Sequence, residues 1–382
     1  TRNLPPLVGG MERLNWHLAA ELSKTAEVRV IGPAGGAALA PAGVSVREVP
    51  LRPLWKFLLC AWHTARREAR RWRPDVVLAG SGLTAPLARA AARVCGARSA
   101  VYAHGLDIAV QHPVYRAIWL PAIRAMDVVI ANSHATAGLC RGVGVADERL
   151  TIVHPGVDLP PTPVTGTMEA ATHGADIAAN NIRQHLGLDQ CRILLSVGRL
   201  STRKGLREFV THSLPRVVAT CPDVMLVVVG DAPAQALHAT AQTPDSIRAA
   251  AAEVGVGDHL KFLGIITDYA KLGAIYRAAD VHVFPVREIP GDPEGFGMVA
   301  VEAAAHGLPT VAFATGGVVD AVAEGQSGHL VKTGDYAAFA QAVTVTLADE
   351  QTWAPRCEAF AARFAWSAFG EQTRAALAPP TA

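Results

Sequence analysis

The chain of 382 residues is half hydrophobic and 18% charged, which excludes a disordered protein and allows two domains with cores of their own. Its formal net charge is +2, but residues 1–160 carry 19 Lys and Arg against 11 Asp and Glu, a balance of +8, and the remaining residues balance at −6. The two halves are therefore expected to meet different partners, or each other.

Apolar runs and cysteines narrow the class further. No apolar run approaches the roughly 18–20 residues that a membrane helix needs, and we expect no signal peptide. The six cysteines are scattered, with no Cys-x-x-Cys pair. This spacing argues against a disulfide framework or a zinc site and predicts reduced thiols in a cytoplasmic protein.

The amino-terminal stretch predicts the end of a strand followed by a helix. Residues 1–10 have the pattern of the last part of a first strand with its loop, so we expect a further strand before Thr1. Gly9 and Gly10 then precede a helix over residues 11–23, whose leucines repeat on one face. A glycine pair at a helix start lets a phosphate approach the backbone, although an ordinary turn would use the same residues.

Residues 52–73 form the most basic stretch of the chain. Seven Lys and Arg stand there against one glutamate, with Trp55, Phe57, Trp62 and Trp72 interleaved. A basic helix with aromatic residues is typical of a peripheral protein on an anionic membrane. An ordinary amphipathic helix, with its tryptophans in the core and its arginines in water, is the alternative. No nucleic-acid recognition motif accompanies the patch, so we expect no nucleic-acid partner.

Short apolar runs in the first 160 residues predict the strands of a parallel sheet, at 27–31, 44–49, 74–79, 99–103, 127–131 and 150–153. His104 and Asp107 follow one of these strands directly. Ligand sites of open α/β sheets lie at such carboxyl ends, so the pair is a candidate substrate contact. A turn or capping cluster is the alternative.

A second α/β block follows residues 161–190, whose Pro, Thr and Ala predict a linker and a lead-in helix. The block opens with a strand over 192–197 and a loop that carries Arg199, Arg203 and Lys204. Arg199 and Lys204 are suited to neutralise a diphosphate, with a basic surface turn as the alternative. Further strands are predicted at 224–230, 259–263, 280–285 and 310–313, and a helical tail at 336–378.

The segment from Glu294 to Glu302 carries two acids eight residues apart, with Gly295 and Gly297 just after the first. It stands between two apolar runs, in a strand–loop–helix–strand pattern. Unpaired N–H groups and the positive end of the helix dipole favour a phosphate at the helix start. Glu294 in the loop and Glu302 about two turns along the helix would then flank a sugar nucleotide. Solvated glutamates on an ordinary βα unit are the alternative.

Two blocks of alternating strands and helices predict an α/β protein of two Rossmann-like, doubly wound domains that face each other across a cleft. The order of the motifs resembles that of the GT-B glycosyltransferases, most closely the retaining family 4. The motifs are Gly-Gly-Met-Glu-Arg, His-Gly-Leu-Asp, His-Pro-Gly-Val-Asp, Gly-Arg-Leu-x-x-Arg-Lys-Gly and Glu-Gly-Phe-Gly-x4-Glu-Ala. The resemblance spans nearly the whole chain and is strongest to bacterial phosphatidylinositol mannosyltransferase-like and lipopolysaccharide or polysaccharide enzymes. One departure is His154, where the family often has Asn.

The resemblance implies a domain plan and a role for each matching position. The plan is an acceptor-side domain at 1–160, the linker and lead-in helix at 161–190, a nucleotide-sugar domain at 191–358, and a helical tail at 359–382 that packs back on the first domain. The implied catalytic residues are His104, Arg199, Lys204 and Glu294, and the acceptor-side residues are Asp107 and Arg13. The implied donor contacts are Gly9, Gly10, Arg199, Lys204, Gly230, Asp231, Glu294, Gly295, Phe296, Gly297, Met298, Val299 and Glu302.

The implied reaction is transfer of a hexose with retention of its anomeric configuration. Arg199, Lys204 and the helix start would stabilise the departing diphosphate, and no Asp-x-Asp element occurs in a plausible loop, so we expect no metal and no cofactor. The acceptor would attack from the leaving-group face, so no side-chain nucleophile is assigned and Glu294 positions the donor sugar. GDP-mannose, UDP-glucose and UDP-N-acetylglucosamine are the candidate donors.

The expected acceptor is a lipid-linked glycan or a polysaccharide of the cell envelope. The expected location is the cytoplasm, with residues 52–73 as the candidate contact to the inner membrane face. A sugar-nucleotide epimerase of the same fold and a non-catalytic nucleotide-sugar-binding protein are the alternatives. A dinucleotide-dependent oxidoreductase is disfavoured, because the chain lacks Gly-x-Gly-x-x-Gly with an acid about 20 residues further on.

Overall fold

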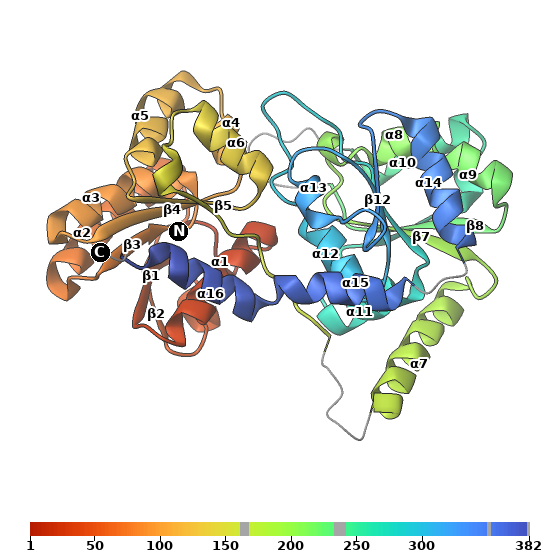
Figure 1. Cartoon of the computed structure of the whole chain (residues 1–382), viewed down its shortest axis with the longest axis horizontal. Helices are drawn as coiled ribbons and strands as arrows, with labels where there is room; N and C mark the ends of the chain where they lie inside the picture. The colour runs from red at the N-terminus through yellow and green to blue at the C-terminus, as the bar shows by residue number, and fades with distance from the viewer. Residues whose placement is uncertain (161–167, 233–241, 350–352, 380–382) are drawn as a thin grey trace. The chain divides into compact units, whose positions relative to one another are not determined.

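The computed structural model describes residues 1–160, 168–232, 242–349 and 353–379, with residues 168–176 as backbone only (Figure 1). Its contacts divide the chain into two compact units. Unit 1 comprises Thr1–Gly156 together with Phe364–Ala382, and unit 2 comprises Val157–Arg363. The part of the predicted linker at 161–167 lies outside the described residues. In the described part of the chain, no helix combines the length and the apolar character needed to cross a bilayer.

Unit 1 is a parallel α/β unit with two sheets, β1–β2 and β3–β4–β5–β6. All of the strand pairings within these two sheets are parallel. Its helices and strands are α1 (Gly10–Ser23), β1 (Val28–Pro33), β2 (Val44–Val49), α2 (Leu54–Trp72), β3 (Val76–Ala79), α3 (Ala85–Cys95), β4 (Arg98–Ala103), α4 (Leu106–Ala109), α5 (Pro113–Arg124), β5 (Val128–Ala131), α6 (His134–Gly142), β6 (Leu150–Ile152) and α16 (Trp366–Leu377).

Helices cover the strands of unit 1 in two layers. Leu120, Ile123 and Met126, from α5 and the turn after it, pack with residues of α3, β4, β5 and α6 in one buried cluster. α16 packs against α1 and β5, and the ring of Trp366 stacks on His17 with their centroids 3.9 Å apart. The end of the chain therefore groups with the amino-terminal unit, although it follows unit 2 in the sequence.

Unit 2 holds one six-stranded parallel sheet in the order β12–β11–β10–β7–β8–β9. The strands lie close to the predicted ranges, and those of β7 and β11 are the same. Its helices and strands are α7 (Met168–Leu186), β7 (Arg192–Val197), α8 (Leu206–His212), α9 (Leu214–Thr220), β8 (Val224–Val229), α10 (Pro244–Glu253), β9 (Leu260–Gly264), α11 (Tyr269–Ala278), β10 (Val281–Phe284), α12 (Met298–Ala305), β11 (Thr310–Phe313), α13 (Val318–Ala321), β12 (Gly328–Val331), α14 (Tyr336–Ala348) and α15 (Ala354–Ala361).

The sheet of unit 2 is buried between two helix layers (Figure 1). One cluster joins the strands to α8, α9, α10 and α14 through residues such as Phe209, Phe313 and Phe339. The other joins them to α7, α11 and α12 through residues such as Leu195 and Tyr276. Burial on both faces explains why these strands are continuous apolar runs in the sequence. The predicted fold class, two doubly wound α/β units with parallel sheets, is confirmed.

The basic helix α2 buries one face and exposes aromatic residues on another. Phe57 is fully buried, whereas Trp55 is 63% exposed, Leu59 is 59% exposed and Trp62 is 40% exposed. These three lie at positions i, i+4 and i+7, so they share one side of the helix. The alternative in which the tryptophans of this stretch lie in the core is therefore wrong for Trp55 and Trp62.

Candidate active site

The carboxyl edge of the sheet of unit 2 gathers the loops that carry the predicted donor contacts. β7 is the first strand of this sheet and lies between β10 and β8, so the order of the strands reverses beside it. The loops after β7 and β10, residues 198–205 and 285–297, leave the same edge at this point. Ligands of open α/β sheets bind at such a switch point, which makes this edge the first place to look for a site.

A glycine holds the loop after β7 against the end of β10. Gly205 has a φ of +68°, a left-handed conformation that favours glycine, and a Cβ there would lie 2.1 Å from the Pro285 carbonyl oxygen. The Arg287 N–H also donates to the Arg203 carbonyl oxygen at 2.8 Å. These contacts place the turn Thr202–Lys204 directly against the loop that follows β10.

Glu294 is the centre of a buried cluster of charges. Its Oε2 accepts a hydrogen bond from Lys204 Nζ at 2.9 Å and lies 3.2 Å from Arg203 Nε. Arg203 Nη1 also donates to Asp292 Oδ1 at 2.7 Å. The Lys204 ammonium lies 4.6 Å from the centre of the Phe284 ring, a cation–π distance. Two cations and two acids from two loops are thus locked together at the carboxyl edge.

The charges of this cluster shift one another's titration. Burial alone would raise the pKa of Glu294, but Lys204, Arg203 and more weakly Arg199 outweigh it and lower that pKa to about 2. Burial lowers the pKa of Lys204, and the attraction of Glu294 opposes part of that shift. At neutral pH the Glu294 carboxylate is therefore ionised, and the two cations of the cluster are balanced by its two acids.

The start of α12 adds N–H donors to this edge. Gly297 is the N-cap, with a left-handed φ of +98° and no side-chain cap, and a Cβ there would lie 2.9 Å from Cε1 of Phe284. Phe296 is buried and anchors the turn before the helix. The N–H groups of Met298 and Val299 have no acceptor within the helix. The start of α12 therefore offers an anion two backbone donors and the positive end of the helix dipole.

A second glycine pair supports the Glu294 loop from behind. The Gly317 N–H donates to the Glu294 carbonyl oxygen at 2.9 Å. A Cβ on Gly317 would lie 2.1 Å from the Gly295 carbonyl oxygen, and one on Gly316 would lie 2.6 Å from that of Glu294. The two loops therefore pack backbone to backbone, which leaves no room for a side chain between them.

The remaining predicted donor contacts occupy the same edge or the helix behind it. Glu302 lies on α12, and its Oε2 accepts a hydrogen bond from the Tyr276 hydroxyl at 3.1 Å. Gly230 follows β8, and a Cβ there would lie 1.9 Å from the Gly198 carbonyl oxygen. Asp231 is the next residue along the chain. Its backbone carbonyl oxygen accepts a hydrogen bond from the Leu200 N–H at 2.9 Å. Arg199 is exposed. Their contacts with a donor stay predictions.

In unit 1 the predicted pair of His104 and Asp107 lies at the carboxyl ends of β3 and β4. His104 is buried, and its Nε2 lies 2.9 Å from the Gly80 carbonyl oxygen. The Asp107 carboxylate accepts the His104 N–H at 2.9 Å and the Gly82 N–H at 2.8 Å. The acid therefore ties two loops together, and the substrate contacts predicted for both residues stay predictions.

The glycine pair at the start of α1 lies at the head of a 14-residue helix. Gly9 is the N-cap and no side chain caps the helix, while Gly10 is exposed. The Glu12 side chain folds back, so that its Oε2 would lie 2.4 Å from a Cβ on Gly9. Arg13 is half-buried in the first turn. The predicted approach of a phosphate to Gly9 and Gly10, and the acceptor-side role of Arg13, stay predictions.

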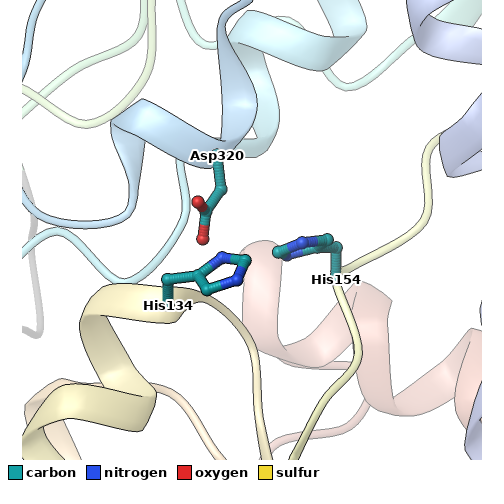
Figure 2. A group of neighbouring side chains, drawn as sticks. All are labelled: His134, His154 and Asp320. Carbon is teal, nitrogen blue, oxygen red and sulfur yellow. The ribbon is translucent and has the colours of Figure 1, made fainter.

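His154, which departs from the family pattern, lies beside a second histidine of unit 1 (Figure 2). Its Nδ1 lies 3.2 Å from the Asn132 carbonyl oxygen, and its ring centre is 5.9 Å from that of His134. Asp320, drawn in the same view, belongs to unit 2 and is not counted with this pair. Two histidines alone do not make up the ligand set of a structural or catalytic zinc site.

Both halves of the chain match known families. Residues 8–160 match the family model described as Glycosyltransferase Family 4, and residues 191–349 match the model described as Glycosyl transferases group 1. The chain belongs to glycosyltransferase family 4. The first match covers the predicted acceptor-side domain of this family 4 chain, and the second covers the loops around Lys204 and Glu294.

Relatives and solved structures agree with that assignment. D-inositol 3-phosphate glycosyltransferase of Mycolicibacterium vanbaalenii is 36% identical over 253 residues, which make up 64% of this chain and 51% of that protein. The family 4 chain spans about half the length of the curated relatives it matches. The structure of Anabaena HepE in complex with UDP-glucose is also similar. The match covers 98% of this chain and 97% of the HepE chain, at 22% identity and a TM-score of 0.75.

Sucrose-phosphate synthase from Thermosynechococcus elongatus is a further structural neighbour. The match covers 96% of this chain and 92% of the synthase chain, at 21% identity and a TM-score of 0.73. At this identity the likeness concerns the fold alone. Together with the Anabaena structure it shows that the family 4 chain has the GT-B fold.

Sequence reasoning did not assign three parts of the charge cluster of this family 4 chain. Arg203 pairs with both acids, and Asp292 is its partner. His282 is fully buried on β10, with Nδ1 3.1 Å from Thr310 Oγ1, and burial followed by the charge of Lys204 lowers its pKa to about 3. The three-cation loop signalled Arg203, but nothing local to the sequence shows that Asp292 or His282 lies beside it.

The charge cluster predicts a loss of stability in acid. Because the folded pKa of Glu294, about 2, lies below its ordinary value of 4.5, the unfolded chain takes up this proton first as the pH falls. The ionised Glu294 carboxylate therefore contributes about 3 kcal/mol to the free energy of unfolding. This contribution is complete above pH 4.5 and is lost as the pH falls from 4.5 toward 2.

Urea unfolding of the wild type and of Glu294→Gln between pH 7 and pH 2.5 measures this contribution. We expect the free energy of unfolding of the variant to fall less steeply below pH 4.5 than that of the wild type. Parallel curves would contradict the ion pairing of Glu294 in solution. Since His282 titrates in both proteins, the difference between the two slopes isolates Glu294.

Proposed function

We propose that the chain is a retaining, metal-independent glycosyltransferase that takes a hexose from a nucleoside diphosphate sugar. One observation supports this most strongly: Arg203 and Lys204 of the loop after β7 converge on the Glu294 carboxylate at the switch point, four residues before α12 begins. A cationic and N–H-lined surface fits a diphosphate, and a carboxylate beside it fits the hydroxyls of the attached sugar.

The chemical step needs charge stabilisation above all. When the bond between the sugar and the phosphate breaks, negative charge develops on the diphosphate and positive charge develops on the sugar ring. Lys204, Arg203 and Arg199 would stabilise the diphosphate, and the N–H groups at the start of α12 would add to them. Arg203 and Lys204, held in place by Asp292 and Glu294, can together with Arg199 supply the charge that a divalent metal supplies elsewhere.

Glu294 positions the donor in this proposal and does not attack it. Its carboxylate is held by Lys204 Nζ at 2.9 Å, and a carboxylate engaged with cations is a weaker nucleophile than a free one. The acceptor hydroxyl would attack from the face that the diphosphate leaves, and a phosphate oxygen would take the acceptor's proton. The bond between the sugar and its phosphate is then replaced by a bond to the acceptor on the same face.

For the donor we propose a UDP-sugar ahead of GDP-mannose, because the Anabaena neighbour was solved in complex with UDP-glucose. For the acceptor we propose an anionic compound with a free hydroxyl. The positive balance of residues 1–160 supports an anionic acceptor, and the relatives named for D-inositol 3-phosphate point the same way. A phosphorylated polyol and an anionic lipid-linked glycan share that chemistry.

Binding of the nucleotide can be tested without knowing the acceptor. UDP and GDP are titrated into the protein in EDTA while the melting temperature is recorded, and we expect UDP to stabilise it. At 100 times its Kd a ligand of the folded state adds about 2.7 kcal/mol. Equal responses to UDP, GDP and inorganic phosphate would contradict a nucleotide site.

Turnover then separates a transferase from a binding protein or an epimerase. The chain is incubated with UDP-glucose in EDTA and either an inositol phosphate or anionic lipid-linked glycans, and the products are separated. We expect UDP together with an α-linked product from this α-linked donor. A β-linked product would contradict retention, an epimeric UDP-sugar would indicate an epimerase, and tight binding without turnover would indicate a binding protein.

We also propose that α2 attaches the protein to an anionic membrane surface. Trp55, Leu59 and Trp62 form an exposed apolar side on the first half of the helix. Arg67, Arg70 and Arg71 are exposed on its second half. The ring of Trp62 lies beneath the Arg66 guanidinium at 4.6 Å. Apolar side chains beside cations are what a surface of anionic lipids binds.

Vesicle sedimentation tests this attachment. We expect the wild type to bind phosphatidylglycerol vesicles strongly and phosphatidylcholine vesicles only weakly. It should dissociate from the phosphatidylglycerol vesicles as the salt concentration rises. The triple variant Trp55→Ser, Leu59→Ser, Trp62→Ser should bind at least about tenfold less tightly, or ~1.4 kcal/mol.

The matched control for this experiment changes an exposed apolar pair elsewhere in unit 1. Val114 and Ile118 on α5 are each 52% exposed, and they are four residues apart on one side of that helix. The variant Val114→Ser, Ile118→Ser should bind as the wild type does. Equal losses in both variants would show that α2 has no special part in membrane attachment.

A further inference from the structure

The hydroxyl of Tyr276 contacts Glu302 from the interior of unit 2. Tyr276 lies on α11 and is 1% exposed, and its hydroxyl donates to Glu302 Oε2 on α12 at 3.1 Å. A buried tyrosine hydroxyl needs a hydrogen-bond partner, so one explanation is that the glutamate only satisfies the tyrosine. The other explanation is that the tyrosine orients the glutamate, whose side chain is half-buried and so stays open to a ligand.

The Tyr276 ring is itself held in place on two sides. The His306 ring stacks on it, with their centroids 5.3 Å apart and their planes at 18°. His306 is fixed in turn, because its Nδ1 lies 2.9 Å from the Glu302 carbonyl oxygen, and a Cβ on Gly273 would lie 2.8 Å from its Nε2. The ring of His282 lies 6.3 Å away at 70°. The phenol therefore has little freedom to move, and its hydroxyl stays directed at the carboxylate.

The position of Glu302 on α12 directs its carboxylate toward the start of that helix. Met298 is the first residue of α12, and Glu302 follows it by about 6 Å along the helix axis. Side chains of an α-helix lean toward its amino-terminal end. A nucleotide with its diphosphate at the helix start would bring its ribose to this carboxylate, because the ribose is joined directly to the diphosphate.

We infer that Tyr276 is a positioning residue that holds the Glu302 carboxylate for the ribose hydroxyls of the donor, and that it thereby makes the site selective for ribonucleotides. The inference rests on the proposed function, since it needs a nucleoside diphosphate at the start of α12. A carboxylate offers about four lone-pair sites, so the bond from Tyr276 leaves capacity for two ribose hydroxyls. An acceptor that is already fixed loses less conformational freedom when it binds a hydroxyl.

Tyr276→Phe tests this role by removing the hydroxyl alone. Phenylalanine keeps the ring that stacks on His306, and water can replace the lost bond at the half-buried Glu302, so we expect the variant to fold. Calorimetry in EDTA measures the Kd of UDP and of 2′,3′-dideoxy-UDP. We expect the wild type to bind UDP at least about tenfold more tightly than the dideoxy compound. In the variant UDP should bind about fivefold to tenfold more weakly, and 2′,3′-dideoxy-UDP should bind as before.

Steady-state kinetics with UDP-glucose give a second measurement. The ribose contact is made equally before and during the chemical step, so KM should rise in Tyr276→Phe while kcat stays unchanged. In a protein that already carries Glu302→Ala, adding Tyr276→Phe should change neither the Kd of UDP nor the KM further. Two residues that act through one contact are not additive.

Tyr102→Phe is the matched control. Tyr102 of unit 1 is also fully buried, and its hydroxyl donates to the Val153 carbonyl oxygen at 2.7 Å. This variant loses a buried tyrosine hydroxyl but no contact with Glu302. It should therefore discriminate between UDP and 2′,3′-dideoxy-UDP as the wild type does.

The outcomes separate this inference from the proposed function. If the wild type bound no UDP, the proposed function would fail and the inference with it. If the wild type bound UDP and 2′,3′-dideoxy-UDP equally, the nucleotide site would stand, but the ribose contact and the role of Tyr276 would be overturned. Full discrimination in Tyr276→Phe, or an equal loss for both nucleotides, would show that Tyr276 only packs the core and would overturn the inference alone.

Discussion

Replacing Lys204 with methionine is expected to lower turnover of the donor by about 10²- to 10³-fold, because it removes a fixed cation from the place where charge develops on the diphosphate. Methionine keeps most of the volume of the side chain beside Phe284. Initial rates with saturating UDP-sugar measure the loss, and the same change in kcat and in kcat/KM would show that the interaction is made in the transition state.

The same substitution also tests the ion pair. It leaves the Glu294 carboxylate, which is 10% exposed, with Arg203 as its remaining cation, and breaking a buried pair is destabilising by up to about 3 kcal/mol. Adding Glu294→Gln removes the unpaired charge. We expect the double variant Lys204→Met, Glu294→Gln to regain most of the stability and none of the activity.

Lys271→Met is the control for this pair of experiments. Lys271 is exposed on α11 in the same unit, so its replacement should change neither turnover nor stability. Near-normal turnover in Lys204→Met, with the protein folded, would remove Lys204 from the catalytic group. A double variant as unstable as the single one would show that Glu294 and Lys204 do not stabilise each other.

Gly317→Ala is expected to disrupt the donor site although residue 317 carries no functional group. The φ of Gly317 is −76°, which any residue can adopt, so backbone strain is not the reason. The added Cβ would lie 2.1 Å from the Gly295 carbonyl oxygen and 2.7 Å from the Phe296 Cα. These are backbone atoms, so the whole loop that holds Glu294 must move away.

A shift of about 1 Å in a positioning loop can cost 10²-fold in rate, and overpacking of this kind costs about 1–3 kcal/mol of stability. We expect both losses in Gly317→Ala, together with weaker binding of UDP. Gly257→Ala is the matched control, since a Cβ there meets its nearest atoms at 3.8 Å. If Gly317→Ala kept full activity, the two loops would not be packed as closely in solution.

Much of the fold follows from local pattern. The strands of both units are short apolar runs, and the ranges predicted for β2, β7 and β11 are those of the structure. Parallel strands buried on both faces are marked by continuous apolar residues, and this signal needs no long-range contact. The α/β class with two doubly wound units could be predicted for the same reason, and the structure confirms it.

Helices with weaker patterns, such as α10 and α11, were not predicted as separate elements. Their buried residues are mostly alanine and glycine, with only a few larger side chains. The helical periodicity of large apolar residues is therefore weak in their sequences. Packing against the neighbouring helices and strands stabilises them, and such packing cannot be seen in a local stretch of sequence.

The sequence by itself determined which residue types stand at the carboxyl ends of the strands, including Lys204, Glu294 and the glycines around them. Only the tertiary structure decided their pairing. Lys204 and Glu294 are 90 residues apart, and the strand order that brings β7 beside β10 is a property of the whole sheet.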